Sequence, residues 1–282
     1  CGRGGLLRHI PSGTYAVSDQ AIADVLDPPY GEHASNLGVL LARELGDMAG
    51  IPSFFVDPVC VDEMTPVAHV TGFKGMERES FFHALNQKSI ARKAAKLLGK
   101  TYEEARLIVI HMGGGVSVAA HENGLAVDDF NVKDEGAFGM DRAGSLPVNA
   151  MINLCFSGLT KQEVKKLLGS EAGAYSYVGT KDFREVERRA FEENDPDCRM
   201  VFDAMAYQLA KDIGAMAAVL KFQVDAIVYT GGMAYSDRFT QAITDYVGNL
   251  APVLRLPGEE EMRSLAEGAL RVLHGEQAKV YP

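Results

Sequence analysis

Apolar residues along this chain follow two alternating patterns, one with the spacing of an amphipathic helix and one of short continuous runs. The first pattern and the residues that flank it predict helices over 37–48, 90–98, 201–220, 236–247 and about 259–273. The second predicts strands over 52–56, 106–110, 116–120, 125–130 and 225–230. Gly50 and Gly99 mark the ends of two helices. This alternation predicts an α/β fold in which helices pack on mixed sheets.

The most informative segment lies between two predicted strands, where His111 is closely followed by three consecutive glycines, 113–115. Glycine allows close approach of the backbone, and clustered amide groups form an anion-binding nest. Further along, Asn123 and Gly124 favour a tight type I′ hairpin. The segment is not a P-loop, because no Gly-Lys-Ser/Thr follows and a strand comes next. A phosphate-binding turn and a glycine-rich hairpin with a structural histidine both fit these residues.

A second glycine turn follows the strand predicted at 225–230, where Gly231 and Gly232 precede a predicted helix. Two such turns far apart in sequence suit a nucleotide that the backbone holds at several points. Between them, the glycine-punctuated loop 133–147 contains a single arginine, Arg142. If the loop faces the glycine turns, Arg142 is a candidate catalytic group. Otherwise it is expected to pair with a neighbouring acid of the loop at the surface.

Composition indicates a cytoplasmic enzyme. The chain has 282 residues, of which 47% are hydrophobic and 23% charged, enough for one or two ordinary cores. Its formal charge of −10 argues against nonspecific binding to nucleic acid or to an anionic membrane. The four cysteines show no CxxC spacing, so the sequence suggests neither a zinc site nor a disulfide framework. Anionic substrates would need local positive groups and backbone amides to hold them.

Eight stretches in collinear order carry a family resemblance. They are GRGGLL at 2–7, YGEHASNLG at 30–38, FVDPV at 55–59, FFHALNQK at 81–88, HMGGG at 111–115, GAFGMDRAGSLP at 136–147, GG at 231–232 and PGEEE at 257–261. They resemble the acetate and butyrate kinase family of acyl-phosphate-forming kinases, with butyrate kinases as the most similar members.

The resemblance implies the two-domain actin-like ATPase fold of sugar kinases, Hsp70 and actin. Residues 1–60 with 262–282 would belong to the N-terminal domain, and residues 61–261 to a second domain with the nucleotide-binding turns. Family members begin with a hydrophobic strand and an Asn-Pro-Gly-Ser phosphate hairpin, whereas residue 1 enters the family pattern after them. The first domain is therefore expected to be incomplete here, and this chain alone is not expected to be a competent kinase.

The implied activity is reversible, ATP-dependent phosphorylation of a short-chain fatty acid, with butyrate as the expected acceptor. Acetate, propionate and branched-chain acids are alternatives, because one methylene changes binding by only about 1–3 kcal/mol. A carboxylate is already deprotonated, so the reaction needs charge neutralisation and no general base. Two other classes stay open, a different actin-like ATPase such as a sugar kinase and a non-catalytic nucleotide-binding fragment. The family also leads us to expect a homo-oligomer, a dimer or larger.

The same resemblance assigns roles to residues. Arg142 would stabilise charge on the transferring phosphoryl group, His111 would donate to its oxygens, and His83 would lie nearby in a positioning role. The implied nucleotide-binding positions are Gly113, Gly114, Gly115, Gly231 and Gly232.

Magnesium prefers oxygen ligands, and Asp57 with Glu261 or Glu259 are the candidates. Acids at the start of a helix also offset its macrodipole without any catalytic task, so the two glutamates have a structural alternative. In a sugar kinase, Asp57 would serve as the base. The positions expected to contact the acid substrate are Arg3, His33 and Phe82. His33 has a structural alternative as a helix cap.

Overall fold

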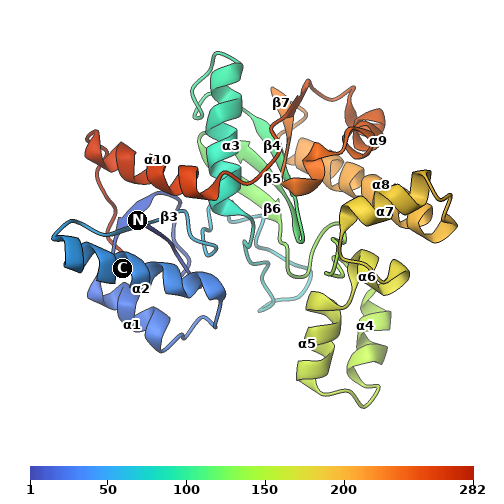
Figure 1. Cartoon of the computed structure of the whole chain (residues 1–282), viewed down its shortest axis with the longest axis horizontal. Helices are drawn as coiled ribbons and strands as arrows, with labels where there is room; N and C mark the ends of the chain where they lie inside the picture. The colour runs from blue at the N-terminus through green and yellow to red at the C-terminus, as the bar shows by residue number, and fades with distance from the viewer.

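The computed structural model describes residues 1–282 and contains two separate β-sheets. The smaller sheet has the order β1 (Gly2–Arg3), β3 (Phe54–Val56), β2 (Thr14–Ala16). β1 runs parallel to β3, and β2 runs antiparallel to it. Helices α1 (Asp19–Leu26), α2 (Leu37–Ala49) and α10 (Glu261–Leu273) pack around this sheet (Figure 1). The two ends of the chain therefore meet in one unit.

Aromatic packing holds this unit together. Tyr15 stacks on Phe55 with ring centroids 5.2 Å apart, and Tyr281 meets Phe55 edge-on at 6.2 Å. Val56 of β3 packs with Leu265 of α10 in a small buried cluster. Because Tyr281 and Leu265 lie in the C-terminal part of the chain, residues from both ends of the sequence bury the first sheet.

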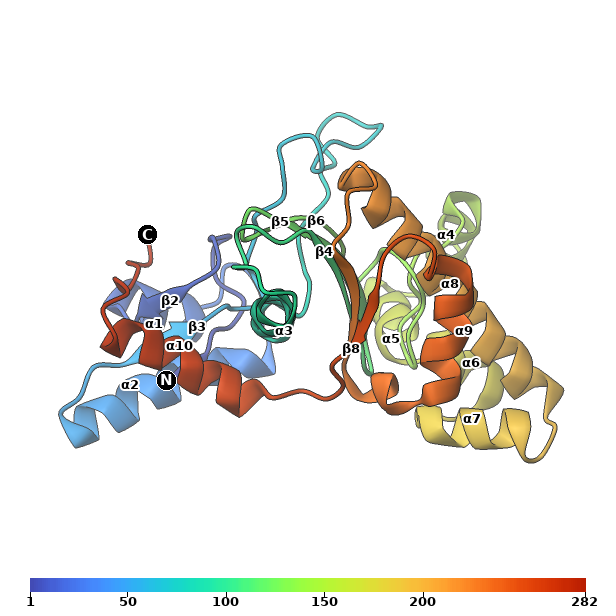
Figure 2. The same cartoon turned by 90° about the horizontal axis from the view of Figure 1, so that it is seen from above.

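The larger sheet has five strands in the order β6 (Leu125–Phe130), β5 (Val116–Glu122), β4 (Leu107–Met112), β7 (Ala226–Thr230), β8 (Val253–Arg255). The β4–β5 and β5–β6 pairs are antiparallel, whereas β4–β7 and β7–β8 are parallel. Figure 2 shows α3 (Ala84–Leu97) on one face and α8 (Pro196–Val219) with α9 (Asp237–Val247) on the other.

Alternation along β4 explains why both faces of this sheet are covered. Leu107 and Val109 belong to the cluster under α3, while Ile108 and Ile110 belong to the larger cluster under α8 and α9. Successive side chains of a strand point to opposite faces, so a strand buried on both faces must be apolar throughout. All six residues of β4 are buried.

The remaining helices extend from the α8 side of the molecule. They are α4 (Val148–Cys155), α5 (Lys161–Ser170), α6 (Gly173–Val178) and α7 (Phe183–Phe191), with short 3-10 helices at Ala34–Asn36 and Gly232–Tyr235. No helix is both long enough and apolar enough to cross a membrane.

The predicted helices and strands are confirmed in type and order, and the turn chemistry is confirmed at two points. Gly50 ends α2 in the left-handed conformation with φ 65°. Asn123 and Gly124 have φ of 54° and 76°, as a type I′ hairpin requires. The prediction was wrong about where two helices begin: α3 starts at Ala84 and α8 at Pro196. Short elements such as β1, β2, β8 and α4 were not predicted, because two to eight residues carry little periodicity. Helices α1, α5, α6 and α7 were also missed.

Candidate active site

Parallel pairing brings the two glycine turns to one edge of the larger sheet. β4 ends at Met112 and β7 at Thr230, and these parallel neighbours leave the sheet side by side. Gly231 has φ 85°, and a Cβ added there would lie 2.4 Å from the carbonyl oxygen of Met112. Gly231 also exchanges two backbone hydrogen bonds with Gly258. Gly231 is therefore required by the fold itself, so that the two turns can approach.

Gly232 and Gly114 differ from Gly231. Both are exposed, and a Cβ added to either would meet no atom within 4 Å. Nothing in the protein itself demands glycine at these two positions. Gly115 resembles Gly231, since a Cβ there would lie 2.5 Å from Val132. Of the predicted nucleotide-binding glycines, Gly114 and Gly232 are thus the ones whose missing side chain leaves space for a ligand.

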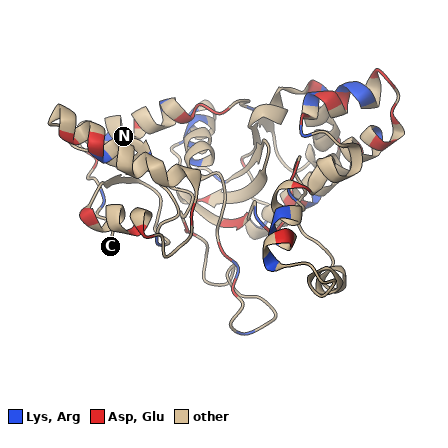
Figure 3. Cartoon of the chain, turned by 60° about the horizontal axis from the view of Figure 1, so that its bottom comes forward, with Lys and Arg blue, Asp and Glu red and all other residues tan.

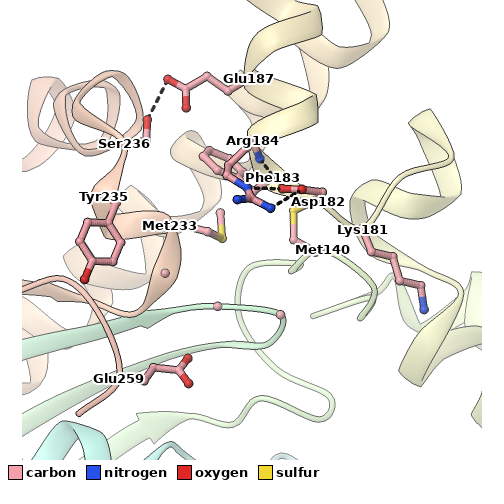
Figure 4. Close-up of a pocket in the computed structure, with 13 residues that line it drawn as sticks. Met140, Lys181, Asp182, Phe183, Arg184, Glu187, Met233, Tyr235, Ser236 and Glu259 are labelled. Atoms are coloured by element: carbon pink, nitrogen blue, oxygen red, sulfur yellow. Dashed lines mark hydrogen bonds and ion pairs between the residues drawn. The ribbon is translucent and has the colours of Figure 1, made fainter.

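A cavity of about 900 Å³ lies over both turns. Gly113, Gly114 and Gly232 contribute to its wall, together with Glu259 (Figure 4). Met233, Tyr235 and Ser236 continue this wall from Gly232, and Met140, residues 181–184 at the start of α7 and Glu187 complete the lining. The size suits a small-molecule ligand such as a nucleotide.

Sequence reasoning missed the wall at residues 181–184. Asp182 caps α7 by accepting a hydrogen bond from the backbone N–H of Arg184, and its carboxylate also pairs with the Arg184 side chain at 2.7 Å. The Asp-x-x-Glu pattern at 182–185 is a recognisable helix start. That signal locates the helix, but it does not indicate which cavity the helix faces.

The two predicted histidines lie in contact. The rings of His83 and His111 stack with centroids 3.7 Å apart and planes inclined by 16°. His111 Nδ1 lies 2.9 Å from Asn86 Oδ1, and His111 Nε2 lies 3.0 Å from Glu259 Oε1. When both ring nitrogens of His111 carry protons, the ring forms an ion pair with the Glu259 carboxylate. The hydrogen bond from His111 lowers the pKa of Glu259, so the carboxylate stays ionised.

Arg142 has no carboxylate partner. Its guanidinium donates a long hydrogen bond of 3.4 Å to the carbonyl of Val132, and it would lie 3.6 Å from a Cβ added at Gly115. The neighbouring acid Asp141 pairs instead with Lys181 at 3.3 Å. The loop therefore faces the glycine turn, and the surface pairing considered as an alternative does not occur.

Positive groups gather around these residues in a protein that is acidic as a whole. Acidic and basic positions are otherwise interspersed over the molecule (Figure 3). Burial, then the charges of His111, Arg142 and Arg3, hold the pKa of His83 well below its usual value. Burial, Arg3 and Arg142 also lower the pKa of His33. The structure thus places His83 and His111 in contact, with Arg142 and Arg3 close enough for their charges to act on His83 and His33.

Two of these residues also have local partners. Arg3 pairs with Glu261 at 2.9 Å, each side chain being about one-third exposed. His33 Nδ1 accepts a hydrogen bond of 3.1 Å from the backbone N–H of Ser35, so this side chain caps the 3-10 helix Ala34–Asn36. The capping alternative for His33 is therefore confirmed, and the side chain is only partly covered by its surroundings.

Asp57 and Phe82 are placed differently from the other candidates. Asp57 is only 2% exposed, accepts a hydrogen bond of 2.7 Å from Gly13 N–H and lies 3.7 Å from Arg92. Burial raises its pKa. Phe82 is also 2% exposed and packs in a small core cluster. Neither residue lines the cavity over the glycine turns.

The predicted magnesium ligands therefore do not form one group. No three His, Cys, Asp or Glu side chains lie close enough together to hold a metal. Magnesium is often held by one or two carboxylates and the phosphates of its nucleotide, so such a group is not required. Glu259 fits this role, because its carboxylate lines the cavity beside Gly113.

These features define the class of protein. An α/β fold with mixed sheets, two glycine turns and an adjacent nucleotide-sized cavity is the actin-like ATPase fold. Residues 72–254 match the model of the Acetokinase family, and the chain belongs to that family.

Solved structures agree with this fold. Acetate kinase from Porphyromonas gingivalis is 21% identical with a TM-score of 0.79, over 93% of this chain and 75% of that one. A propionate kinase from Francisella tularensis is 17% identical with a TM-score of 0.73, over 92% and 77% of the two chains. Acetate kinase from Entamoeba histolytica is 14% identical with a TM-score of 0.80, over 97% and 79%.

Proposed function

We propose that the protein transfers the γ-phosphoryl group of ATP to the carboxylate of a short-chain fatty acid, with butyrate as the acceptor. A carboxylate oxygen attacks the γ-phosphorus, the bond to the β–γ bridging oxygen breaks, and the products are an acyl phosphate and ADP. The observation that carries this proposal is Arg142, a guanidinium without a carboxylate partner beside a glycine turn.

The residues of the site match the needs of this reaction. Charge spreads over the equatorial oxygens of the transferring phosphoryl group, so catalysis depends on fixed donors and positioning. Arg142 supplies a positive fork and His83 supplies a ring N–H group. Nε2 of His111, stacked beside it, would have to exchange the Glu259 carboxylate for a phosphoryl oxygen. In this proposal the amides of residues 113–115 cradle the distal phosphates, and Gly232 passes close to the nucleoside.

Magnesium, when bound, would neutralise phosphate charge, and we assign Glu259 as its protein carboxylate. Glu261 pairs with Arg3 and would regulate how strongly that arginine attracts an acid substrate. Arg3 and His33 remain our candidates for holding the carboxylate of the acceptor. Phe82 would act indirectly, because it is buried in a core cluster and directly precedes His83 in the chain.

The proposal extends to organisation and location. We propose two domains, 1–60 with 262–282 and 61–261, with the acid-binding residues between them. We also propose a cytoplasmic homo-oligomer. Support for oligomerisation comes from α4, an apolar helix without one buried residue, and from Phe156 next to it, which is 87% exposed.

A sugar kinase is the second candidate, since it would share the fold and the cavity. Such an enzyme needs a carboxylate base beside the hydroxyl of its substrate. Here Glu259 is the carboxylate that we assign to magnesium, and Asp57 is buried against Gly13. The arrangement therefore favours an acceptor that is already deprotonated.

Trapping acyl phosphates with hydroxylamine tests the proposal directly. The full-length protein is incubated with ATP, magnesium and acetate, propionate, butyrate or isobutyrate, and the hydroxamate is measured. Parallel reactions with hexoses are followed by ADP release. We expect hydroxamate from short acids, most efficiently with butyrate, and no hexose-dependent ADP. Hexose-dependent ADP without hydroxamate would support the sugar kinase, whereas equal efficiency with acetate and butyrate would refute the butyrate assignment.

A further inference from the structure

One ring nitrogen of His83 is held by a chain of buried polar side chains. His83 Nδ1 lies 2.8 Å from Ser117 Oγ, which lies 2.9 Å from Gln87 Nε2. Gln87 Oε1 lies 3.1 Å from His121 Nε2, and His121 Nδ1 lies 2.7 Å from the hydroxyl of Tyr102. Ser117, Gln87 and His121 are at most 1% exposed. Buried polar groups must be satisfied, so each bond in the chain needs a donor and an acceptor.

A backbone carbonyl fixes which groups donate and which accept in this series of hydrogen bonds. Gln87 Nε2 also lies 3.2 Å from the carbonyl oxygen of Ser117, which can only accept. The amide nitrogen of Gln87 must therefore face Ser117, where its two protons meet the carbonyl oxygen and the hydroxyl oxygen. It follows that Gln87 Oε1 faces His121 and accepts a hydrogen bond from it.

The protonation state of His121 is consistent with this order of donors and acceptors. Burial lowers the pKa of His121 to about 3, so the ring is neutral at physiological pH. A neutral imidazole has one donor and one acceptor nitrogen. Nε2–H donates to Gln87, and Nδ1 then accepts from the hydroxyl of Tyr102.

The hydrogen bonds of Ser117 determine which ring nitrogen of His83 carries the proton. The hydroxyl oxygen of Ser117 accepts from Gln87 Nε2 and, at 3.4 Å, from the backbone N–H of His83. The only acceptor within reach of its own proton is His83 Nδ1. His83 Nδ1 is therefore a lone-pair acceptor, and the ring proton lies on Nε2.

We propose that Ser117 and Gln87 are positioning residues that fix His83 in the neutral tautomer whose Nε2–H donates into the active site. The partner of that N–H, a phosphoryl or carboxylate oxygen, rests on the function proposed above, whereas the tautomer follows from the hydrogen bonds alone. A hydrogen-bond donor that is already oriented in the free protein does not have to reorganise when charge develops in the transition state. The second ring nitrogen of a functional histidine commonly decides its tautomer in this way.

Nitrogen NMR of the full chain labelled with ¹⁵N-histidine tests the tautomer without reference to activity. The His83 signals are assigned by their loss in His83→Gln. We expect a proton-bearing, pyrrole-like Nε2 and a pyridine-like Nδ1 in the wild type. A proton on Nδ1 in the wild-type spectrum would overturn the inference, whatever the enzyme does.

Two variants and a matched control test the role of the chain. Ser117→Ala should let the Nδ1–H tautomer appear and lower kcat roughly tenfold with little change in KM for ATP, and Ser117→Thr should recover most of both effects. Ser80→Ala removes another buried hydroxyl, which donates to Asp129 outside the chain, and should leave the His83 spectrum unchanged. An unchanged tautomer in folded Ser117→Ala would overturn the positioning role.

These readouts separate the two proposals. If the protein forms no acyl phosphate but His83 carries its proton on Nε2, the proposed function fails and the tautomer assignment stands. If it forms acyl phosphate and His83 carries its proton on Nδ1, the function stands and the positioning role fails.

Discussion

The ring of His83 lies flat against the ring of His111, with centroids 3.7 Å apart. His83 precedes the first turn of α3, and His111 lies in β4, so the contact joins a helix start to the central strand of the larger sheet. Two charged rings at this distance would repel each other. Burial and the neighbouring charges hold the pKa of His83 well below its usual value, so His83 is neutral at physiological pH. The stacked rings therefore do not place two like charges in contact.

Removing the guanidinium of Arg142 should impair catalysis far more than stability. Arg142→Ala should lower kcat by roughly a thousandfold, since arginine groups that stabilise phosphoryl transfer contribute about 10³–10⁵. Arg142→Lys should rescue poorly, because lysine lacks the planar fork. The guanidinium donates one long hydrogen bond of 3.4 Å to the rest of the protein, so the melting temperature should hardly change. Steady-state kinetics with saturating ATP and butyrate measure the effect. Arg199→Ala on the exposed face of α8 is the control, and near-normal turnover of Arg142→Ala would refute the role.

Two glycine substitutions should separate ligand binding from folding. Gly114→Val places a side chain in open space, so it should weaken ATP binding at least tenfold while unfolding free energy changes by less than about 0.5 kcal/mol. Gly231→Ala forces a Cβ against the backbone of Met112 at φ 85° and should cost about 1–3 kcal/mol. Calorimetry of ATP binding beside thermal melts compares the two. Equal losses of affinity and stability in Gly114→Val would instead favour a purely structural hairpin.

The buried carboxyl of Asp129 should make stability depend on pH. Burial raises its pKa to about 7, while Ser80 donates a hydrogen bond of 2.6 Å to it. Between pH 4 and 7 the folded state retains a proton that the unfolded state has lost, so this stabilisation is present at low pH and disappears as pH rises through 7. Asp129→Asn cannot titrate.

Urea unfolding at pH 5 and pH 8 measures this effect. The unfolding free energy of the wild type should fall relative to Asp129→Asn by about 2–3 kcal/mol between the two pH values. Asp203→Asn, at an exposed position of α8, is the matched control and should show no such difference. A wild type that gains stability relative to Asp129→Asn on going to pH 8 would contradict the prediction.

The buried pair of Lys88 and Glu63 should be costly to break. Their charged atoms lie 2.6 Å apart, and the side chains are 0% and 3% exposed. Lys88→Met leaves an uncompensated buried carboxylate and should lower unfolding free energy by about 3–5 kcal/mol. The double variant Lys88→Met with Glu63→Gln should regain part of that loss. Urea denaturation of the wild type, both single variants and the double variant gives four free energies. A loss in the double variant equal to the sum of the two single losses would show that the two charges do not interact.

Much of the fold was predictable from local pattern. The apolar run that became β4, the Asn123–Gly124 hairpin and the glycine end of α2 depend on residues close in sequence, whose periodicity and allowed φ values are local properties. The same holds for the two glycine turns, since each directly follows a strand. The sequence alone therefore determined which segments could form a phosphate-binding edge.

The tertiary structure decided which side chains meet at that edge. Glu259 and Glu261 are two residues apart and look equivalent in sequence, yet one contacts His111 and the other Arg3. Asp57 follows a strand as a site residue would, but it is buried against Gly13, and no local signal joined residues 181–184 to the cavity. The hydrogen bonds that link Tyr102, His121, Gln87 and Ser117 could not be predicted from the sequence either. Such contacts depend on how distant segments cross in space, which periodicity within one segment cannot encode.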